Sequence, residues 1–121
     1  MPNYPAPFGN GLSPSQQDSF PPSLTTYDTI VTAASATPCT AAGTPASFLV
    51  AIENASSSAQ TATYTFYDNA SAASGQVVFI AATPGAGQVI IFGGNGIALT
   101  NGCVCSASGV AVGAGLRVTV R

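Results

Sequence analysis

The sequence predicts an all-β protein, an antiparallel β-sandwich of about seven or eight short strands preceded by an extended arm. Apolar and polar residues alternate with a period of two in several segments after residue 24, which is typical of half-buried strands. Clusters of Gly, Asn, Asp, Pro and Ser separate these segments. No segment shows a sustained helical period with caps. This pattern favours a sandwich of the jelly-roll or immunoglobulin type.

Residues 1–24 are predicted to form the arm, and residues 25–121 the sandwich domain. Six of the nine prolines precede residue 24, mixed with Asn, Gln, Ser and Gly. Because proline fixes φ and lacks a backbone donor, this stretch is predicted to be extended. The arm either folds back on its own domain or lies across a neighbouring subunit, and we favour the second. Its candidate partner-binding side chains are Tyr4, Phe8, Phe20 and Leu24.

The first three candidate strands are residues 27–32, 46–53 and 61–68. Alternation in the second predicts one face made of Phe48, Val50 and Ile52. The inward side chains of the third are predicted to be Ala62, Tyr64 and Phe66. Its outward side chains form an uncharged stripe of Thr61, Thr63, Thr65 and Tyr67. Such a stripe is either a solvent-facing surface or one that stacks on protein or sugar.

The next two candidate strands, residues 75–81 and 88–92, are apolar on both faces. Strands of this kind are either covered on both sides or turn their outer face towards a partner. We therefore expect partner contacts at four of their side chains, which are Val78, Ile80, Ile90 and Phe92.

The last candidate strands are residues 96–100, 103–106 and 116–121, with a further short one at 110–112. The final strand is predicted to turn Leu116, Val118 and Val120 inwards, and Arg117, Thr119 and Arg121 outwards.

Three cysteines, Cys39, Cys103 and Cys105, are an odd number without the spacing of a disulfide framework. A tetrahedral metal site needs four ligands, and the chain has no histidine to complete one. The cysteines are therefore predicted to be small, buried or half-buried free thiols.

Charged residues are scarce, at 5% of the chain with a net charge of −2, whereas an average soluble domain is about a quarter charged. The chain has no histidine, and its only basic residues are Arg117 and Arg121. General acid–base and nucleophilic catalysis therefore lack a base. We expect no catalytic residue, no metal, no cofactor and no enzymatic activity. Two arginines are too few to neutralise phosphates, and no apolar run has membrane-spanning length, so neither nucleic acid nor membrane is expected as a partner.

From residue 46 onward the motifs follow a recognisable order. A strand ending in Asn54 leads to Tyr-Thr-Phe-Tyr-Asp-Asn-Ala at residues 64–70, then to Pro-Gly-Ala-Gly at 84–87 and Gly-Ile-Ala-Leu-Thr-Asn-Gly at 96–102. This order resembles a group of small β-sandwich virion proteins of tailed bacteriophages. In that group a strand ending in Asn precedes a Tyr-x-x-Tyr-Asp/Asn-x-Ala strand, a Pro-x-Gly hairpin and a Gly-Ile-x-x-x-x-Gly strand. The resemblance covers residues 46–121 and leaves the arm unmatched.

The resemblance implies a non-enzymatic virion structural protein, a capsid cement or decoration protein that binds the outer surface of the major capsid protein lattice and stabilises the head. The implied partners are the major capsid protein and further copies of the chain, with a trimer expected before a dimer. Residues 1–5 lack the basic start of a secretory signal, so the chain is either made in the host cytoplasm, which we expect, or has been trimmed of a signal. The resemblance implies a final location on the capsid surface. The alternative is a tail, fibre or surface domain that binds host glycan or another virion protein.

Overall fold

The structure is a computed structural model that describes residues 26–40 and 46–121. Over these residues the chain is all-β, with nine short strands in two antiparallel sheets and no helix, which confirms the predicted fold class. The strands are β1 (Tyr27–Val31), β2 (Thr37–Pro38), β3 (Phe48–Asn54), β4 (Thr63–Asp68), β5 (Gln76–Ala82), β6 (Val89–Ile91), β7 (Ile97–Ala98), β8 (Val104–Ala107) and β9 (Leu116–Val120).

The predicted arm, residues 1–24, lies outside the described residues, and with it the four candidate anchors Tyr4, Phe8, Phe20 and Leu24. Over the ranges that are described, no helix is long and apolar enough to cross a membrane.

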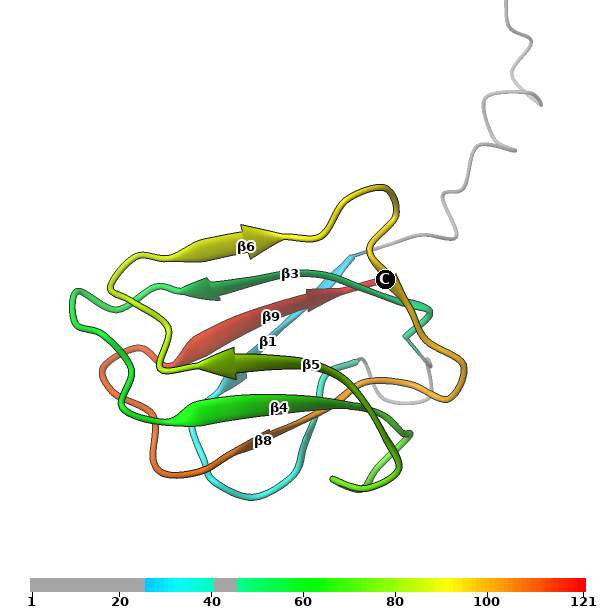
Figure 1. Ribbon diagram of the computed structural model, residues 1–121, viewed down its shortest axis with the longest axis horizontal. Coiled ribbons are helices and arrows are strands. Elements are labelled where there is room, and N and C mark those ends of the chain that lie inside the picture. The colour runs from blue at the N-terminus through cyan, green and yellow to red at the C-terminus, as the bar shows by residue number, and fades with distance from the viewer. Residues whose placement is uncertain (1–25, 41–45) are drawn as a thin grey trace, which may run out of the picture.

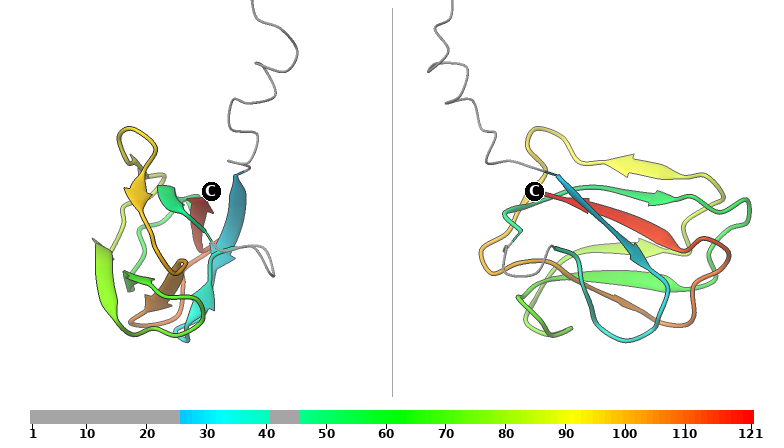
Figure 2. Two further views of the ribbon diagram at one scale, coloured as in Figure 1. Left: turned by 90° about the vertical axis from the view of Figure 1, so that its right-hand side faces the viewer. Right: turned by 180° about the vertical axis from the view of Figure 1, so that it is seen from behind.

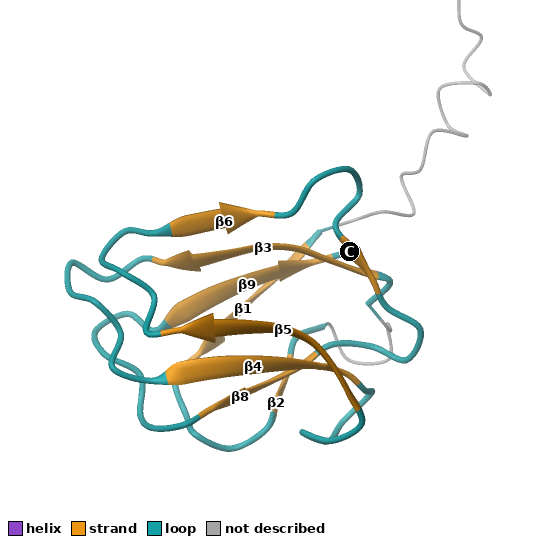
Figure 3. Ribbon diagram, in the orientation of Figure 1, coloured by secondary structure: helices purple, strands orange, loops and turns teal. Residues whose placement is uncertain are grey.

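The strands form two sheets that are packed face to face (Figures 1 and 3). Sheet I has the order β1-β9-β3-β6, with β7 also paired to β3, and sheet II has the order β2-β8-β4-β5. Figure 2, in which the molecule is turned by 90° in the left panel, shows these sheets as two layers.

Early strands pair with late ones in a nested pattern. The first strand β1 pairs with the last strand β9, β2 with β8, β3 with β6 and β7, and β4 with β5. A long hairpin rolled up into two Greek keys gives this pairing, which is that of a jelly roll. An immunoglobulin-type sandwich instead places its first two strands side by side. Of the two predicted sandwich types, the chain therefore has the jelly-roll topology.

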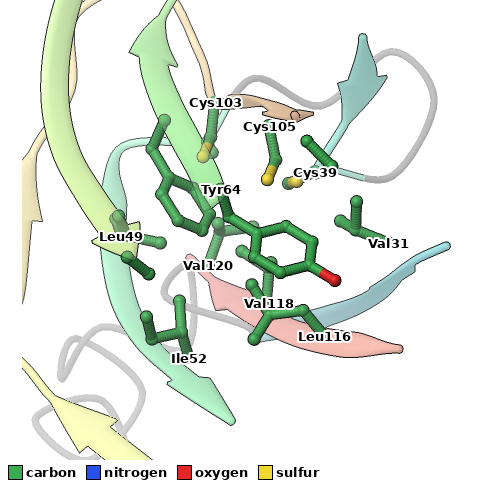
Figure 4. Packing of buried hydrophobic residues seen from close by; sticks show 14 of the residues in the cluster. Val31, Cys39, Leu49, Ile52, Tyr64, Cys103, Cys105, Leu116, Val118 and Val120 are labelled. Atoms are coloured by element: carbon green, nitrogen blue, oxygen red, sulfur yellow. The ribbon is translucent and has the colours of Figure 1, made fainter. Parts of the chain in front are cut away.

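The core lies between the sheets and follows the predicted alternation in β4 and β9. Tyr64 and Phe66 of β4 are buried, and so are Leu116, Val118 and Val120 of β9, while Arg117 between them is exposed. Figure 4 shows Tyr64, Leu116, Val118 and Val120 packed together with Leu49, Ile52 and the three cysteines. At the side of the sandwich between β5 and β6, the rings of Phe79 and Phe92 meet edge to face, with centroids 4.8 Å apart.

In β3 the alternation is interrupted. The register of β3 against β9 shifts between Leu49 and Ala51, as at a β-bulge. Leu49 and Ile52, three residues apart, therefore both reach the core, whereas Phe48 and Val50 are only half-buried. The prediction that Phe48, Val50 and Ile52 share one face is wrong, because strict alternation takes no account of the extra residue.

Two shorter segments also differ from the sequence prediction. The two-residue strand β2, which contains Pro38, was not predicted, since proline argues against a strand except at an edge. Residues 110–112 form no strand and belong to the connection between β8 and β9.

Candidate functional site

The outer face of sheet I carries charged side chains on its edge strand β1 and on its two central strands, β9 and β3. Directly opposite residues of antiparallel strands share one face of the sheet. The register therefore defines two outward rows, Ile30–Arg117–Glu53–Val89 and Asp28–Thr119–Ala51–Ile91. Three of the five charged side chains within the described ranges lie in these rows, and they are Asp28, Glu53 and Arg117.

These charged side chains are paired across the strands. Arg117 and Glu53 form an ion pair of 3.7 Å, with both side chains more than a third exposed to solvent. The hydroxyl of Thr119 donates a 2.7 Å hydrogen bond to the carboxylate of Asp28. Exposed ion pairs contribute little to stability, and the same rows also expose the apolar side chains of Ile30, Val89 and Ile91.

The outer face of sheet II is different, because no charged residue lies in its rows. The rows are Pro38–Val104–Tyr67–Val77, Ser106–Thr65–Ile80 and Thr63–Ala82. We call these residues, apart from the fully buried Val104, the uncharged face. Val77 and Ile80 are 45% and 55% exposed, while Thr65 and Tyr67 are half-buried. A partner that covers this face removes no formal charge of this chain from water, so the usual desolvation penalty is absent.

The four strand residues predicted to contact a partner occupy different positions. Ile80 lies on the uncharged face, and its side chain is exposed to solvent. Val78, Ile90 and Phe92 are half-buried and pack against the core. On β6 the exposed apolar side chains are instead Val89 and Ile91, which the sequence reading did not single out. They were missed because two apolar faces on one strand look alike until the register is known.

The remaining charge near sheet II, Asp68, is engaged by the backbone. Its carboxylate accepts hydrogen bonds from the amide N–H groups of Thr100, at 3.0 and 3.1 Å, and Asn101, at 2.7 Å. The Asn101 bond, with further contributions from Thr100 and Gly102, holds the pKa of Asp68 below its ordinary value. Asp68 thus joins the end of β4 to the segment before β8, and its side chain serves a structural role.

A buried polar network joins three loops at one end of the sandwich. The Asn54 side-chain amide donates to the carbonyl oxygens of Ser58, Pro84 and Gly85 at 2.8–3.1 Å. Gln60 donates to the Asn54 side-chain oxygen, at 3.0 Å, and to the Val112 carbonyl, at 2.8 Å. The Gln60 oxygen accepts from the Tyr64 hydroxyl, at 3.0 Å, and from the Val112 amide, at 2.7 Å.

The Gln60 side-chain amide oxygen and nitrogen and the Tyr64 hydroxyl in this network all have partners, so the network offers no free group to a ligand. Its role is to hold the connections β3–β4, β5–β6 and β8–β9 together. Sequence reasoning placed Asn54 at a strand end and assigned no role to Gln60, because polar residues in a Ser-rich stretch are typical of solvated loops.

The three cysteines are free and buried, as predicted. A hydrogen bond between the Cys103 and Cys39 thiols, together with burial, raises the pKa of Cys103. Burial raises the pKa of Cys105. Figure 4 shows the three sulfur atoms at one side of the core beside Tyr64. The Cys103 and Cys105 thiols are poor nucleophiles, because the reactive thiolate is disfavoured.

Within the part of the chain that is described, no three His, Cys, Asp or Glu side chains come together in a group suited to a metal ion.

Comparison of the chain with protein-family models, with curated proteins and with solved structures found no match. The resemblance of residues 46–121 to bacteriophage virion proteins therefore stays a prediction.

Proposed function

We propose that the chain is a non-enzymatic structural protein of a bacteriophage virion, a capsid cement or decoration protein. In this role it binds the outer surface of the major capsid protein lattice and stabilises the head. The observation that carries the proposal is the division of charge between the two sheets. The uncharged face suits a permanent contact with protein, and the charged rows of sheet I suit exposure to solvent.

In the proposed role, the sandwich stabilises the head by binding to it as a rigid body. The sandwich packs its uncharged face on the lattice, and many copies on a symmetric shell gain by multivalency, so no single contact has to be tight. Because the protein binds the assembled shell and not the separate subunits, binding shifts the equilibrium towards the assembled state. The jelly-roll topology supports this role, since viral capsid domains commonly have it.

The predicted arm adds a second contact in this proposal. Pro-rich, weakly charged residues 1–24 would extend over a neighbouring subunit, with Tyr4, Phe8, Phe20 and Leu24 as anchors. Deletion of residues 1–24 tests this part separately, and head binding that survives the deletion unchanged would contradict the arm's role as a clamp.

The experiment uses heads assembled from the major capsid protein that is encoded with this chain. Wild-type protein should co-sediment with the heads and raise the temperature at which they open. Thr65→Lys, which places a charge at the centre of the uncharged face, should weaken binding by about tenfold or more, because a buried unpaired charge is costly.

The matched control is Ile91→Lys, which places the same charge at an exposed position on sheet I. This variant should bind as wild type does. No binding of wild-type protein to heads would refute the proposal, and so would equal binding by Thr65→Lys and Ile91→Lys.

A second candidate function is recognition of host glycan by a tail, fibre or surface domain. The hydroxyl groups of Thr63, Thr65 and Tyr67 on one sheet face favour it, because aromatic and hydroxyl side chains suit sugar rings and lectins also use jelly rolls. A glycan array separates the two functions. A specific glycan signal that is lost in Tyr67→Ala, together with absence of head binding, would replace the capsid proposal.

A further inference from the structure

A β-sandwich has edge strands whose unpaired backbone N–H and C=O groups can pair with a strand of another chain. Soluble proteins normally have features that prevent this pairing. Among the described residues, the edges of the two sheets are β1, β2, β5 and the edge beside β3 that β6 forms together with the two-residue β7. Three of them carry a recognised protection. β1 contains the charged Asp28, β2 is two residues long and contains Pro38, and β6 is three residues long.

The fourth edge strand, β5, has no charge, no proline and no such shortness, and its one protective feature is the β-bulge at Val78. It has seven residues, Gln76–Ala82, without a charge or a proline. Its sequence is rich in valine, phenylalanine and isoleucine, which favour strands. Within the described ranges it pairs only with β4. The register against β4 shifts at Val78, which leaves Phe79 to Ala82 as a regular stretch after the bulge.

The side chains beside this edge are also free of charge. Ile80 is 55% exposed, and its row on the uncharged face continues through Thr65 and Ser106. A second copy can therefore approach this edge without bringing like charges together, although each copy carries a net charge of −2. An equivalent approach at the edge of sheet I would bring Asp28 of one copy towards Asp28 of the other.

We propose that the β5 edge binds a second copy of this chain, so that β5 pairs with the β5 of its partner in an antiparallel way about a twofold axis. An antiparallel pair of identical strands is compatible with such an axis, because residue i faces residue j and j faces i. Because opposite residues of an antiparallel pair share one face, the two outer faces join only when the axis passes at a residue that faces its own copy, and in the regular stretch Phe79 to Ala82 we place it at Ile80. The two copies of sheet II become one continuous eight-stranded sheet with a single uncharged outer surface.

This pairing gives a dimer where the sequence reading expected a trimer before a dimer. It rests on the edge strands and their charges and not on the capsid proposal. The protein can therefore form this dimer whether or not it binds a virion, and the test below uses the protein alone.

The test is sedimentation equilibrium of the full chain from low to high micromolar concentration. Wild-type protein should be in monomer–dimer equilibrium. Ile80→Lys places two like charges beside the axis and should raise the dimer dissociation constant by about tenfold or more. Because Ile80 is exposed and points away from the core, the variant monomer should keep its thermal transition. The matched control Ile91→Lys changes the most exposed apolar side chain of β6 and should leave the constant unchanged.

Amide hydrogen exchange of the wild type distinguishes pairing at the edge from stacking of faces and does not depend on any variant. The amides of β5 that point away from β4 should become protected as concentration rises, because pairing gives them acceptors. A monomer at every concentration, a trimer, a dimer insensitive to Ile80→Lys, or β5 amides that exchange equally in monomer and dimer would each overturn the proposal.

Discussion

Replacement of Gln60 by leucine tests the buried network that joins the three loops. Gln60 is 1% exposed. Its side chain accepts hydrogen bonds from the Tyr64 hydroxyl and the Val112 amide and donates to the Asn54 side chain and the Val112 carbonyl. Leucine has a similar volume and makes none of these bonds. Gln60→Leu therefore leaves the buried Tyr64 hydroxyl and the partly buried Val112 amide without their acceptor.

The expected loss of stability follows from these two groups. Leaving a buried donor unsatisfied costs about 1–3 kcal/mol. With Val112 only partly buried, the total for Gln60→Leu should be about 2–4 kcal/mol, a large share of the roughly 5–15 kcal/mol that stabilises a typical domain. In the double variant Gln60→Leu, Tyr64→Phe, the orphaned hydroxyl is gone. The loss of stability in the double variant should therefore be smaller, by about 1 kcal/mol, than the sum of the losses in the two single variants.

Urea unfolding followed by far-UV circular dichroism measures these differences. The control is Gln88→Leu, which removes one exposed hydrogen bond, from the Gly85 amide at 2.8 Å, and should cost less than about 1 kcal/mol. A cost for Gln60→Leu no larger than that of Gln88→Leu, or strict additivity with Tyr64→Phe, would refute the view that this network holds the loops together.

Three further predictions concern other parts of the fold. Gly96→Ala should destabilise the protein by about 1–3 kcal/mol more than Gly94→Ala, measured by thermal unfolding, because both have positive φ but only at Gly96 would a Cβ overlap the backbone of Leu49; equal costs would contradict this. The depressed pKa of Asp68 means that its stabilising effect is complete above its unfolded pKa of about 4 and is lost as pH falls through its lower folded pKa. The difference in free energy of unfolding between wild type and Asp68→Asn should therefore shrink as the pH falls. A difference that grows on acidification would contradict this prediction. All three thiols should resist a thiol reagent in the native protein and react after denaturation, whereas rapid native labelling would show that the core is open.

Much of the sandwich could be predicted from side-chain periodicity alone. The buried Tyr64 and Phe66 of β4, and Leu116, Val118 and Val120 of β9, lie where strict alternation puts them. Alternation fails at β3, where the register shift near Val50 changes the inward set, and at β2, where a proline lies on an edge strand. Both exceptions depend on what the strand is paired with, which a single segment of sequence does not reveal.

The candidate site was less predictable, because it depends on strand order. The sequence stripe containing Thr65 and Tyr67 was recognised as uncharged, but the neighbours of β4 in sheet II were unknown. Only the pairing with β5 and β8 brings Ile80 and Ser106 beside Thr65, and only the pairing of β3 with β9 collects Glu53 and Arg117 on the opposite outer face. The roles of Asn54 and Gln60 likewise depend on carbonyl groups that come from loops distant in the sequence.

A density map of the intact particle that contains this protein tests the central claim most directly. We predict that the chain lies on the outer surface of the capsid, with the uncharged face of sheet II covered by protein and the charged rows of sheet I open to solvent. A map in which sheet I is covered while Thr65, Tyr67 and Ile80 face solvent, or in which the chain is absent from the capsid surface, would contradict the account.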